Sequence, residues 1–427
     1  MKEWKTYKLS EIADIQTGPF GSQLHNNDYV DKGTPIVTVE HLGNRKFSTQ
    51  NLPCVSDEDK ARLAKYVLEK GDIVFSRVGS VDRCSYVSSD EDGWMFSGRC
   101  LRVRCNNMCN PLFLYYYFCK ETIKQYIRSV AVGATMPSIN TKLLSDLPII
   151  LPSRKIQDKV AHILARLDDK IELNRQINDN LEQQAQALYK SWFVDFEPFK
   201  DGNFVESELG LIPEGWNVGT YEQIIQSTIS GDWGKDAATG NYTHKVACVR
   251  GCDFQDMKTG VRGKTPERYI LEINYQAKKL EHNDILVEIS GGTSTISTGR
   301  VCIANSDLLD KYNHDIVCTN FCKVLRPVSS YAGYLYYSWI FKYDSKVMFG
   351  YENGTSGIKN FQLSDFISKE PVIVPPMSCV NEFQKLIDNL LKSIQINGSE
   401  IMELELLRDT LLPRLMSGEL KINEIDC

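Results

Sequence analysis

Several polar loops of this 427-residue chain combine Arg or Lys with Asn, Gln, Ser, Thr and Gly. We call residues 1–152 the first block and residues 201–376 the second block, because the loops fall into these two regions. Cations can hold phosphates, whereas amides, hydroxyls and arginine forks can read the edges of bases. The mixture therefore suits contact with duplex DNA, although ordinary surface loops have the same composition.

The side chains with the right chemistry are our candidate DNA contacts. In the first block they are Gln23, Asn26, Lys46, Arg77, Arg83, Arg102 and Arg104. In the second block they are Lys235, Arg250, Arg262, Lys264, Thr293, Ser294, Thr295 and Lys359. Arg102 and Arg104 stand two residues apart in a strand-like segment, so we expect both on one face.

Catalytic motifs are missing from the sequence. It contains no phosphate-binding loop of the G-x-x-x-x-G-K-[ST] type, no G-x-G-x-x-G turn, no G-x-S-x-G elbow and no H-E-x-x-H helix. An Asn-Pro-Pro-aromatic motif for a flipped adenine is also missing. Cys248/Cys252 and Cys318/Cys322 have a C-x-x-x-C spacing, but no regularly spaced histidines accompany them. We therefore predict no catalytic residues, no metal site and no cofactor bound by this chain.

The overall composition is that of a water-soluble chain with more than one core. A length of 427 residues suggests several domains, and no apolar run is long enough to cross a membrane. The 13 scattered cysteines and the lack of a signal peptide predict a cytoplasmic protein with reduced thiols. The formal charge of −6 lies mainly in two helix-forming runs, so any DNA-binding face must be a local patch.

The two blocks repeat one another. Each contains a G/N-D-I turn, an apolar strand, a Gly/Ser-rich loop and a return strand, followed by an aromatic helix and an L-S-D turn. The matching segments are Lys70–Val87 with His282–Val301, Pro111–Lys120 with Tyr331–Lys342, and Gly133–Pro152 with Gly354–Pro375. A helical run follows each block, so the order is globular, helix, globular, helix. The fold class we predict is α+β, with two similar domains, two long helices and an internal pseudo-twofold duplication.

The two helical runs carry heptad patterns. Steps of seven give Val160, Leu167, Asn174, Leu181 and Leu188 in the first run, and Phe383, Leu390, Asn397, Leu404 and Leu411 in the second. An apolar seam of this kind is typical of a coiled coil, and a seam Asn often fixes its register. We predict an antiparallel pair in which Asn174 faces Asn397, Leu167 faces Leu404 and Leu181 faces Leu390. Two amphipathic helices that pack separately on their domains are the alternative.

Each helical run ends in a cluster of large apolar side chains. The first ends with Trp192, Phe193, Phe196 and Phe199, and the second with Leu411, Leu412, Leu415 and Met416. We interpret both clusters as the places where the helices dock on a globular block. Pro413 is expected to disrupt the second helix, because proline lacks an N–H group and clashes with the preceding turn.

Five segments together resemble one family. They are LSEIADIQTG (Leu9–Gly18), GDIVFSR (Gly71–Arg77), LYKSWFVDFEPF (Leu188–Phe199), GLIPEGW (Gly210–Trp216) and LLPRLMSGEL (Leu411–Leu420). Over essentially its full length, the sequence is similar to the specificity subunits of type I restriction–modification systems.

This resemblance implies a non-catalytic subunit that binds double-stranded DNA together with partner subunits. The partners would be two methylation subunits, which use S-adenosylmethionine, and restriction subunits, which use ATP and Mg. The implied domains are target-recognition domains at 1–152 and 201–376, a first spacer helix at 153–200, and a second spacer helix with a tail at 377–427.

Our functional prediction is a subunit that reads an asymmetric, two-part DNA target and directs adenine methylation and restriction by its partners. A helix over 158–190 would span about 50 Å, consistent with half-sites about one DNA turn, roughly 34 Å, apart. The alternative is a two-lobed scaffold that binds proteins and uses the helices as a spacer. A steep salt dependence of DNA binding would separate the two.

Overall fold

The computed structural model describes residues 4–293, 295–328, 330–354 and 359–420. The chain divides into two compact units, which we describe separately. Unit 1 comprises residues 1–169 and 405–427, and unit 2 comprises residues 170–404. Each long helix therefore contributes residues to both units. Among the described residues, no helix is both long enough and apolar enough to cross a membrane.

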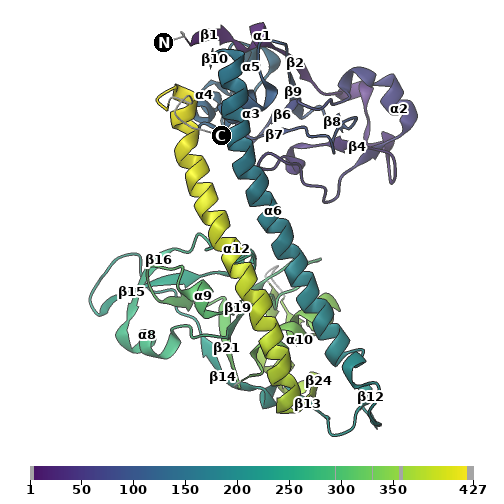
Figure 1. Ribbon diagram of the computed structural model, residues 1–427, viewed down its shortest axis with the longest axis vertical. Helices are drawn as coiled ribbons and strands as arrows, with labels where there is room; N and C mark the ends of the chain where they lie inside the picture. The colour runs from purple at the N-terminus through teal and green to yellow at the C-terminus, as the bar shows by residue number, and fades with distance from the viewer. Residues whose placement is uncertain (1–3, 294, 329, 355–358, 421–427) are drawn as a thin grey trace. The chain divides into compact units, whose positions relative to one another are not determined.

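Unit 1 contains two four-stranded sheets and a two-stranded ribbon (Figure 1). The first sheet has the order β2 (Ala13–Thr17), β9 (Cys100–Cys105), β6 (Ile73–Ser76), β7 (Cys84–Tyr86). The second has the order β3 (Tyr29–Val30), β5 (Cys54–Val55), β4 (Thr34–Val37), β8 (Met95–Phe96), and β1 (Lys5–Lys8) pairs with β10 (Pro148–Leu151). The helices, apart from the two long ones, are α1 (Leu9–Ile12), α2 (Asp57–Arg62), α3 (Pro111–Cys119), α4 (Glu121–Val130) and α5 (Thr141–Ser145).

Unit 2 repeats this plan. Its four-stranded sheet has the order β14 (Ile225–Ser230), β21 (Cys322–Pro327), β17 (Asp284–Glu288), β19 (Val301–Ala304). A second sheet has the order β16 (Glu267–Leu271), β15 (Tyr242–Val249), β20 (Ile316–Cys318), and β13 (Asn217–Thr220) pairs with β24 (Pro371–Val374). The helices, again without the long ones, are α7 (Phe254–Lys258), α8 (Glu272–Lys278), α9 (Ser306–Leu309), α10 (Ala332–Asp344) and α11 (Leu363–Lys369). The smaller strands are β11 (Phe204–Ser207), β12 (Gly210–Pro213), β18 (Ser290–Gly291), β22 (Glu352–Asn353) and β23 (Lys359–Phe361).

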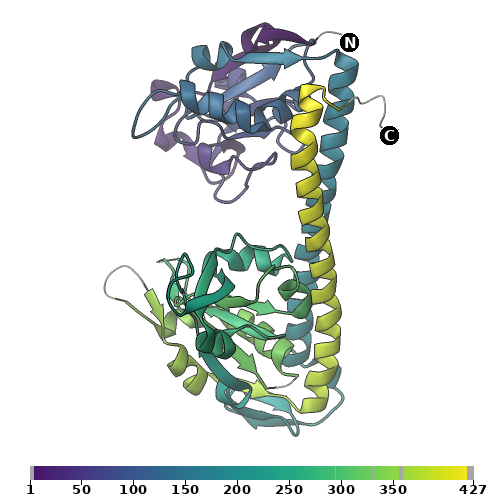
Figure 2. The same ribbon diagram turned by 90° about the vertical axis from the view of Figure 1, so that its left-hand side faces the viewer.

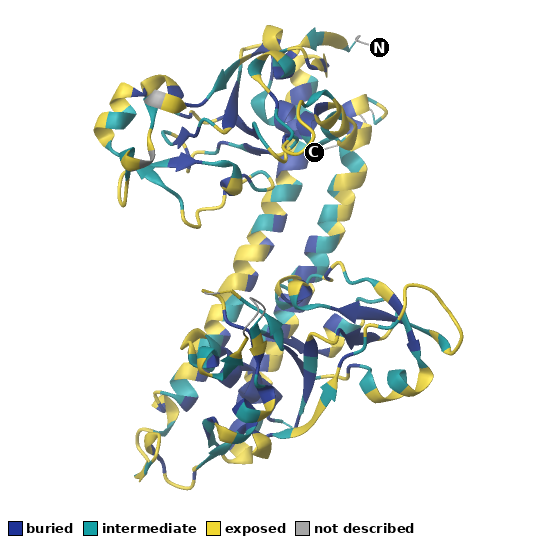
Figure 3. Cartoon of the chain, turned by 180° about the vertical axis from the view of Figure 1, so that it is seen from behind, coloured by how far each residue is buried: buried dark blue, intermediate teal, exposed yellow. Residues whose placement is uncertain are grey.

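Strand pairing confirms the duplication. The sheet β2-β9-β6-β7 corresponds strand for strand to β14-β21-β17-β19. In the second sheets, β4 is antiparallel to β5 and parallel to β8, just as β15 is antiparallel to β16 and parallel to β20. Apolar strand residues fill the interior of each unit, seen as dark blue in Figure 3. The predicted α+β class with two similar domains is therefore confirmed.

The long helices α6 (Arg154–Phe193) and α12 (Met377–Ser417) lie side by side within each unit (Figures 1 and 2). In unit 2, Lys170 Nζ lies 3.2 Å from Glu400 Oε2 near one end of the pair. Near the other end, the Phe193 and Phe383 rings lie 4.9 Å apart. In unit 1, Arg408 donates to Asp168 over 2.8 Å. These contacts confirm the antiparallel orientation.

The predicted register is wrong by about one helical turn. Asn397 Nδ2 donates to Asn178 Oδ1 over 2.8 Å, whereas Asn174 Nδ2 donates to Glu400 Oε2 over 2.8 Å. Asn174 therefore does not face Asn397. The seam that is best buried is the neighbouring row, Ile171, Asn178 and Ala185 with Ile387, Ile394 and Ile401.

The hydrogen bonds of Asn178 explain why its heptad row, and not the row of Asn174, forms the buried seam. Asn178 Nδ2 donates to the Thr259 carbonyl (2.9 Å) and to the Ile394 carbonyl (3.2 Å). A buried amide needs hydrogen-bond partners, and Asn178 finds them on the side of α6 that faces Thr259 and Ile394. Leu181 and Leu390 are left partly buried beside the core of unit 2. Leu167 and Leu404 belong to different units.

This register makes a prediction for the two asparagines of α6. Asn178→Leu should cost about 1–3 kcal/mol of unfolding free energy, because Asn397 and the Thr259 carbonyl lose their hydrogen-bond partner. Asn174→Leu should be neutral or stabilising, because Asn174 Oδ1 is buried without a partner among the described residues. Urea unfolding of both variants measures the difference. Equal losses of stability would contradict the register.

Both apolar clusters lie where the helices were expected to dock. Phe193 ends α6, and Phe196 follows in a left-handed conformation with a φ of 55°. Phe193 and Phe196 pack on Trp216, with ring centroids 5.9 and 5.6 Å apart, and Trp192 packs against the same core. At the end of α12, Leu415 is buried in the core of unit 1 and Leu411 flanks it. Both docking predictions are confirmed.

The expected effect of Pro413 is wrong. Helix α12 continues through Pro413 and ends at Ser417. The proline stands four residues before the end of the helix, and its missing N–H removes only one backbone hydrogen bond. Gly418 then adopts a φ of 75° and ends the helix against Trp4, where a Cβ would come within 2.9 Å of the indole ring.

Candidate nucleic-acid interface

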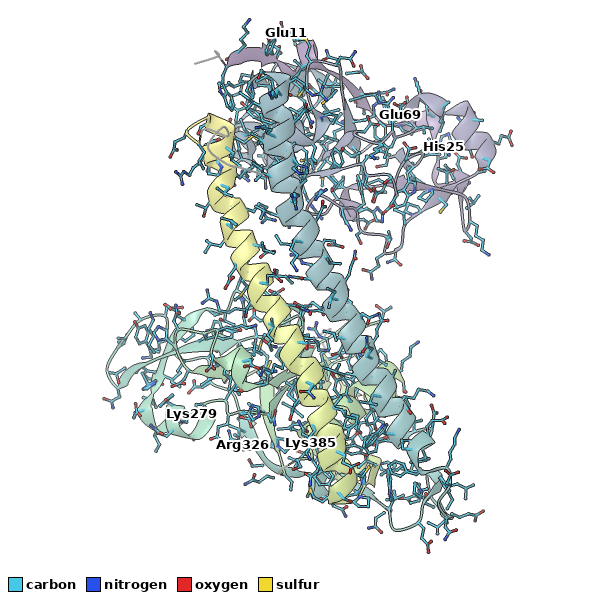
Figure 4. All side chains as sticks on the ribbon, viewed as in Figure 1. Glu11, His25, Glu69, Lys279, Arg326 and Lys385 are labelled. Carbon is cyan, nitrogen blue, oxygen red and sulfur yellow. The ribbon has the colours of Figure 1, made fainter. Side chains whose placement is uncertain are left out.

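Matching ion pairs occupy equivalent positions in the main sheets of the two units. In unit 1, Arg104 donates to both carboxylate oxygens of Asp72 over 2.7 Å and to Glu69 over 2.5 Å. In unit 2, Arg326 donates to both oxygens of Asp284 over 2.9 and 2.8 Å, and Glu281 lies 3.1 Å away. Asp72 and Asp284 are each 1% exposed. Figure 4 labels one member of each network, Glu69 in unit 1 and Arg326 in unit 2.

The backbone around the loops also matches. Ser97 N donates to Val37 O over 2.8 Å, and Thr319 N donates to Val249 O over 2.9 Å. The next turn closes with Cys100 N on Ser97 O in unit 1 and with Cys322 N on Thr319 O in unit 2. The same framework therefore presents loops of different sequence.

The structure separates the unit 1 candidates into two groups. Arg102 and Arg104 share one face of β9, but both guanidinium groups are used within the fold. Arg102 is 5% exposed and donates to Asp14 over 2.7 Å and to the Lys65 carbonyl over 3.2 Å. We therefore leave Arg102 and Arg104 out of the proposed DNA surface.

The remaining unit 1 candidates lie at the loops. Lys46 and Arg83 are exposed, and Arg77 is half-buried. Arg77 donates to the Gly98 carbonyl over 3.1 Å, and the Gln23 amide oxygen accepts from Tyr66 OH over 2.7 Å. The side chain of Asn26 lies outside the described part of the chain.

The unit 2 candidates separate in the same way. Lys235, Arg262, Lys264, Thr293 and Thr295 are exposed, and Ser294 lies outside the described residues. Thr293 Oγ1 accepts from the Ile296 N–H over 3.0 Å, which shapes the turn that also carries Thr295.

Two further unit 2 candidates are engaged in ion pairs. Arg250 donates to Asp253 over 2.9 Å and to the Lys264 carbonyl over 2.9 Å. Lys359 donates to Glu352 over 2.6 Å. The Arg250 and Lys359 side chains therefore stabilise their own loops even without a ligand.

Sequence reasoning missed four exposed residues, two beside the loops of each unit. Phe20 is 62% exposed, Trp233 38% and Phe321 65%, and Arg99 is also exposed. Trp233 and Phe321 line a pocket of about 420 Å³ together with Arg250, Glu288 and Asn320. The sequence contains a signal for two of these residues. A Gly-x-aromatic pattern, Gly18-Pro19-Phe20 and Gly231-Asp232-Trp233, follows the first strand of the main sheet in each unit.

Three of the four cysteines with C-x-x-x-C spacing are buried. Burial raises the pKa of Cys248 and of Cys322 to about 12, and it raises that of Cys318 well above its usual range. These thiols are therefore protonated at neutral pH and do not act as thiolates. No cluster of three or more metal-binding side chains occurs among the described residues.

Comparisons with known proteins agree with this geometry. Residues 1–183 match the family model for the type I restriction modification DNA specificity domain. The MjaIX specificity subunit of Methanocaldococcus jannaschii is 24% identical, over 99% of this chain and 95% of that protein. The HindI specificity subunit of Haemophilus influenzae is 25% identical, over 98% of this chain and 100% of that protein.

A solved structure shares the fold. The S subunit of a type I restriction–modification system from M. genitalium aligns over 97% of this chain and 96% of its own, with a TM-score of 0.55 and 15% identity. The chain is thus similar to type I restriction–modification specificity subunits over essentially its whole length.

Proposed function

We propose that this chain is the DNA sequence-specificity subunit of a type I restriction–modification complex. Unit 1 would read one half-site and unit 2 the other. The observation that carries the proposal is one framework, with matching Arg104–Asp72 and Arg326–Asp284 pairs, that presents different loops in each unit. Two different readers in one chain predict a target of two unlike parts.

We assign the parts of the chain accordingly. Residues 1–152 and 201–376 would be the target-recognition domains, 153–200 the first spacer helix, and 377–427 the second spacer helix with its tail. The base-reading and phosphate-binding side chains would come from the exposed candidates. These are Lys46 and Arg83 in unit 1, and Lys235, Arg262, Lys264, Thr293 and Thr295 in unit 2.

The chemistry would be supplied by partner subunits in the cytoplasm. Two methylation subunits would bring S-adenosylmethionine and methylate adenine, and restriction subunits would bring ATP, Mg and cleavage. The resemblance to specificity subunits supports this division, because the resemblance implies a chain that recognises DNA and leaves catalysis to its partners. This chain would then determine which sequence is modified.

The first test is to find the target. Methylation-sensitive sequencing of the host genome, with and without this chain, should reveal a methylated motif in two separated parts. If no motif depends on the chain, or if the motif is a single continuous site, the proposed function is wrong.

The second test predicts the role of two exposed cations. Arg83→Ala in unit 1 and Lys264→Ala in unit 2 should each lower the salt slope of DNA binding by about one, because each removes one phosphate contact. Both variants should weaken specific and random duplexes alike. Titration of binding against salt measures the slope. Lys385, which is exposed on α12 (Figure 4), provides the control Lys385→Ala, which should leave the slope unchanged. Slopes that match wild type for both test variants would remove these residues from the interface.

A further inference from the structure

The glycine that follows the first strand of the main sheet packs unusually closely against a backbone carbonyl in both units. A Cβ on Gly18 would lie 2.2 Å from Ser97 O, and a Cβ on Gly231 would lie 2.0 Å from Thr319 O. Only glycine permits so close an approach to a carbonyl. Gly18 therefore lies directly against the turn 97–100, and Gly231 lies directly against the turn 319–322. The aromatic residue two positions later, Phe20 or Trp233, is exposed at the surface.

A cation supports each ring. The Arg77 guanidinium carbon lies 5.9 Å from the Phe20 ring centroid while its Nη1 donates to the Gly98 carbonyl. In unit 2, the Arg268 guanidinium carbon lies 4.2 Å from the Trp233 ring, and its Nε donates to the Trp233 carbonyl over 2.8 Å. Arg268 is 6% exposed, so Trp233 rests on a buried support. Each ring is thus positioned before any ligand arrives.

The residue beside the ring differs between the units. Arg77 N donates to Arg99 O over 2.8 Å, and Ile289 N donates to Phe321 O over 2.9 Å, so Arg99 and Phe321 occupy equivalent positions. The ring in unit 1 therefore has an exposed arginine as its neighbour. The ring in unit 2 has a second exposed aromatic side chain and a pocket of about 420 Å³.

The charges of this pocket are largely neutralised within the unit. Glu288 accepts from Arg300 over 2.7 and 2.6 Å, and Arg250 is paired with Asp253. A neutral, aromatic-walled site next to cationic loops suits the flat, uncharged parts of a nucleic acid. In a duplex the base faces are stacked on one another, so an aromatic ring can pack on the sugars and on the apolar edges of the bases, and these contacts do not depend on phosphate charge.

We propose that Phe20 and Trp233 are equivalent DNA contacts, one in each unit, that pack their rings on the bases or sugars of the two half-sites. This inference rests on the proposed function. It adds a non-ionic contact that is common to both readers, with Arg99 and Phe321 as neighbours that make the two sites different. We infer that duplex DNA is the ligand of both rings, because both rings lie next to the candidate DNA-contacting loops.

The test uses the full-length chain and a duplex carrying the methylated motif found above. Phe20→Ala and Trp233→Ala should each weaken binding to this duplex about tenfold. The salt slope should stay at the wild-type value, because no phosphate contact is lost. Phe20→Tyr and Trp233→Phe should restore most of the affinity, because they keep a ring.

Scrambled half-sites assign each ring to its own reader. On a duplex whose unit 1 half-site is scrambled, Phe20→Ala should have no further effect, and Trp233→Ala should behave likewise for the other half-site. The controls Met108→Ala in unit 1 and Leu211→Ala in unit 2 remove side chains that are 46% and 61% exposed elsewhere, and should change nothing.

The outcomes are distinct. If wild-type protein binds the motif and both alanine variants bind it equally well, the inference is wrong while the proposed function stands. A lowered salt slope in the alanine variants would also overturn the inference, because it would mean that the rings act through their neighbouring cations. If wild-type protein shows no preference for the motif, the proposed function itself fails.

Discussion

Replacing Arg104 by alanine is expected to destabilise unit 1 by about 3–5 kcal/mol, the usual cost of leaving a buried carboxylate without its partner. Asp72 is 1% exposed and accepts both of its short hydrogen bonds from this guanidinium group. It also accepts from the Glu69 N–H over 2.8 Å, so the pair closes the turn that leads into β6. Arg326→Ala should have a comparable effect on unit 2, where Asp284 accepts from the Glu281 N–H over 2.8 Å.

Hydrogen exchange would localise the two effects. Arg104→Ala should increase exchange in residues 67–105 and leave residues 279–327 unchanged, and Arg326→Ala should do the reverse. Lys8→Ala is the matched control, because it removes the exposed Lys8–Asp146 pair and should leave protection in unit 1 unchanged. If Arg104→Ala kept wild-type stability but lost salt-dependent DNA binding, Arg104 would be a DNA contact as the sequence first suggested.

Gly398→Ala is expected to cost about 3 kcal/mol, at the upper end of the usual range for overpacking. A Cβ at this position of α12 would lie 2.1 Å from the Gly260 carbonyl oxygen and 2.6 Å from its Cα. Both obstacles are backbone atoms, so no side chain can rotate out of the way. The turn at Gly260 would have to move away from the helix.

Two polar side chains complete this contact. Lys311 Nζ donates to the Gly260 carbonyl (2.6 Å), the Gln395 carbonyl (2.7 Å) and Gln395 Oε1 (2.8 Å), and Asn178 Nδ2 donates to the Thr259 carbonyl. Burial lowers the pKa of Lys311 to about 8. Displacing the turn would therefore break several bonds at once.

The functional consequence would fall on the loop that follows the turn. Arg262 and Lys264 lie two and four residues beyond Gly260, so we expect Gly398→Ala to weaken reading of the unit 2 half-site only. Urea unfolding and hydrogen exchange over 254–270 would report the displaced turn. Gly350→Ala is the control, because a Cβ there has nothing within 4 Å. Wild-type stability and exchange in Gly398→Ala would show that the helix and the turn are not tightly joined.

Repetition in the sequence was enough to determine the architecture. Matching strands and aromatic helices recur in both blocks, whereas the L-S-D segments that we expected to form turns lie at the end of α5 and at the start of α11. Local patterns of this kind depend on residues close together in the chain. The same holds for the two long helices and for the clusters at Trp192 and Leu415 that dock them. Even the orientation of the helix pair followed, because each helix leaves its own block.

Only the tertiary structure decided the register and the roles of the arginines. Two rows of α6 are nearly equally apolar, and the choice of Asn178 over Asn174 depends on a carbonyl at Thr259, far away in the sequence. Arg83 and Arg104 likewise look equivalent in the sequence. Arg104 is an internal cation because folding brings Asp72, 32 residues away, against it, whereas Arg83 remains exposed. Such pairings depend on contacts between distant segments, and no local pattern encodes them.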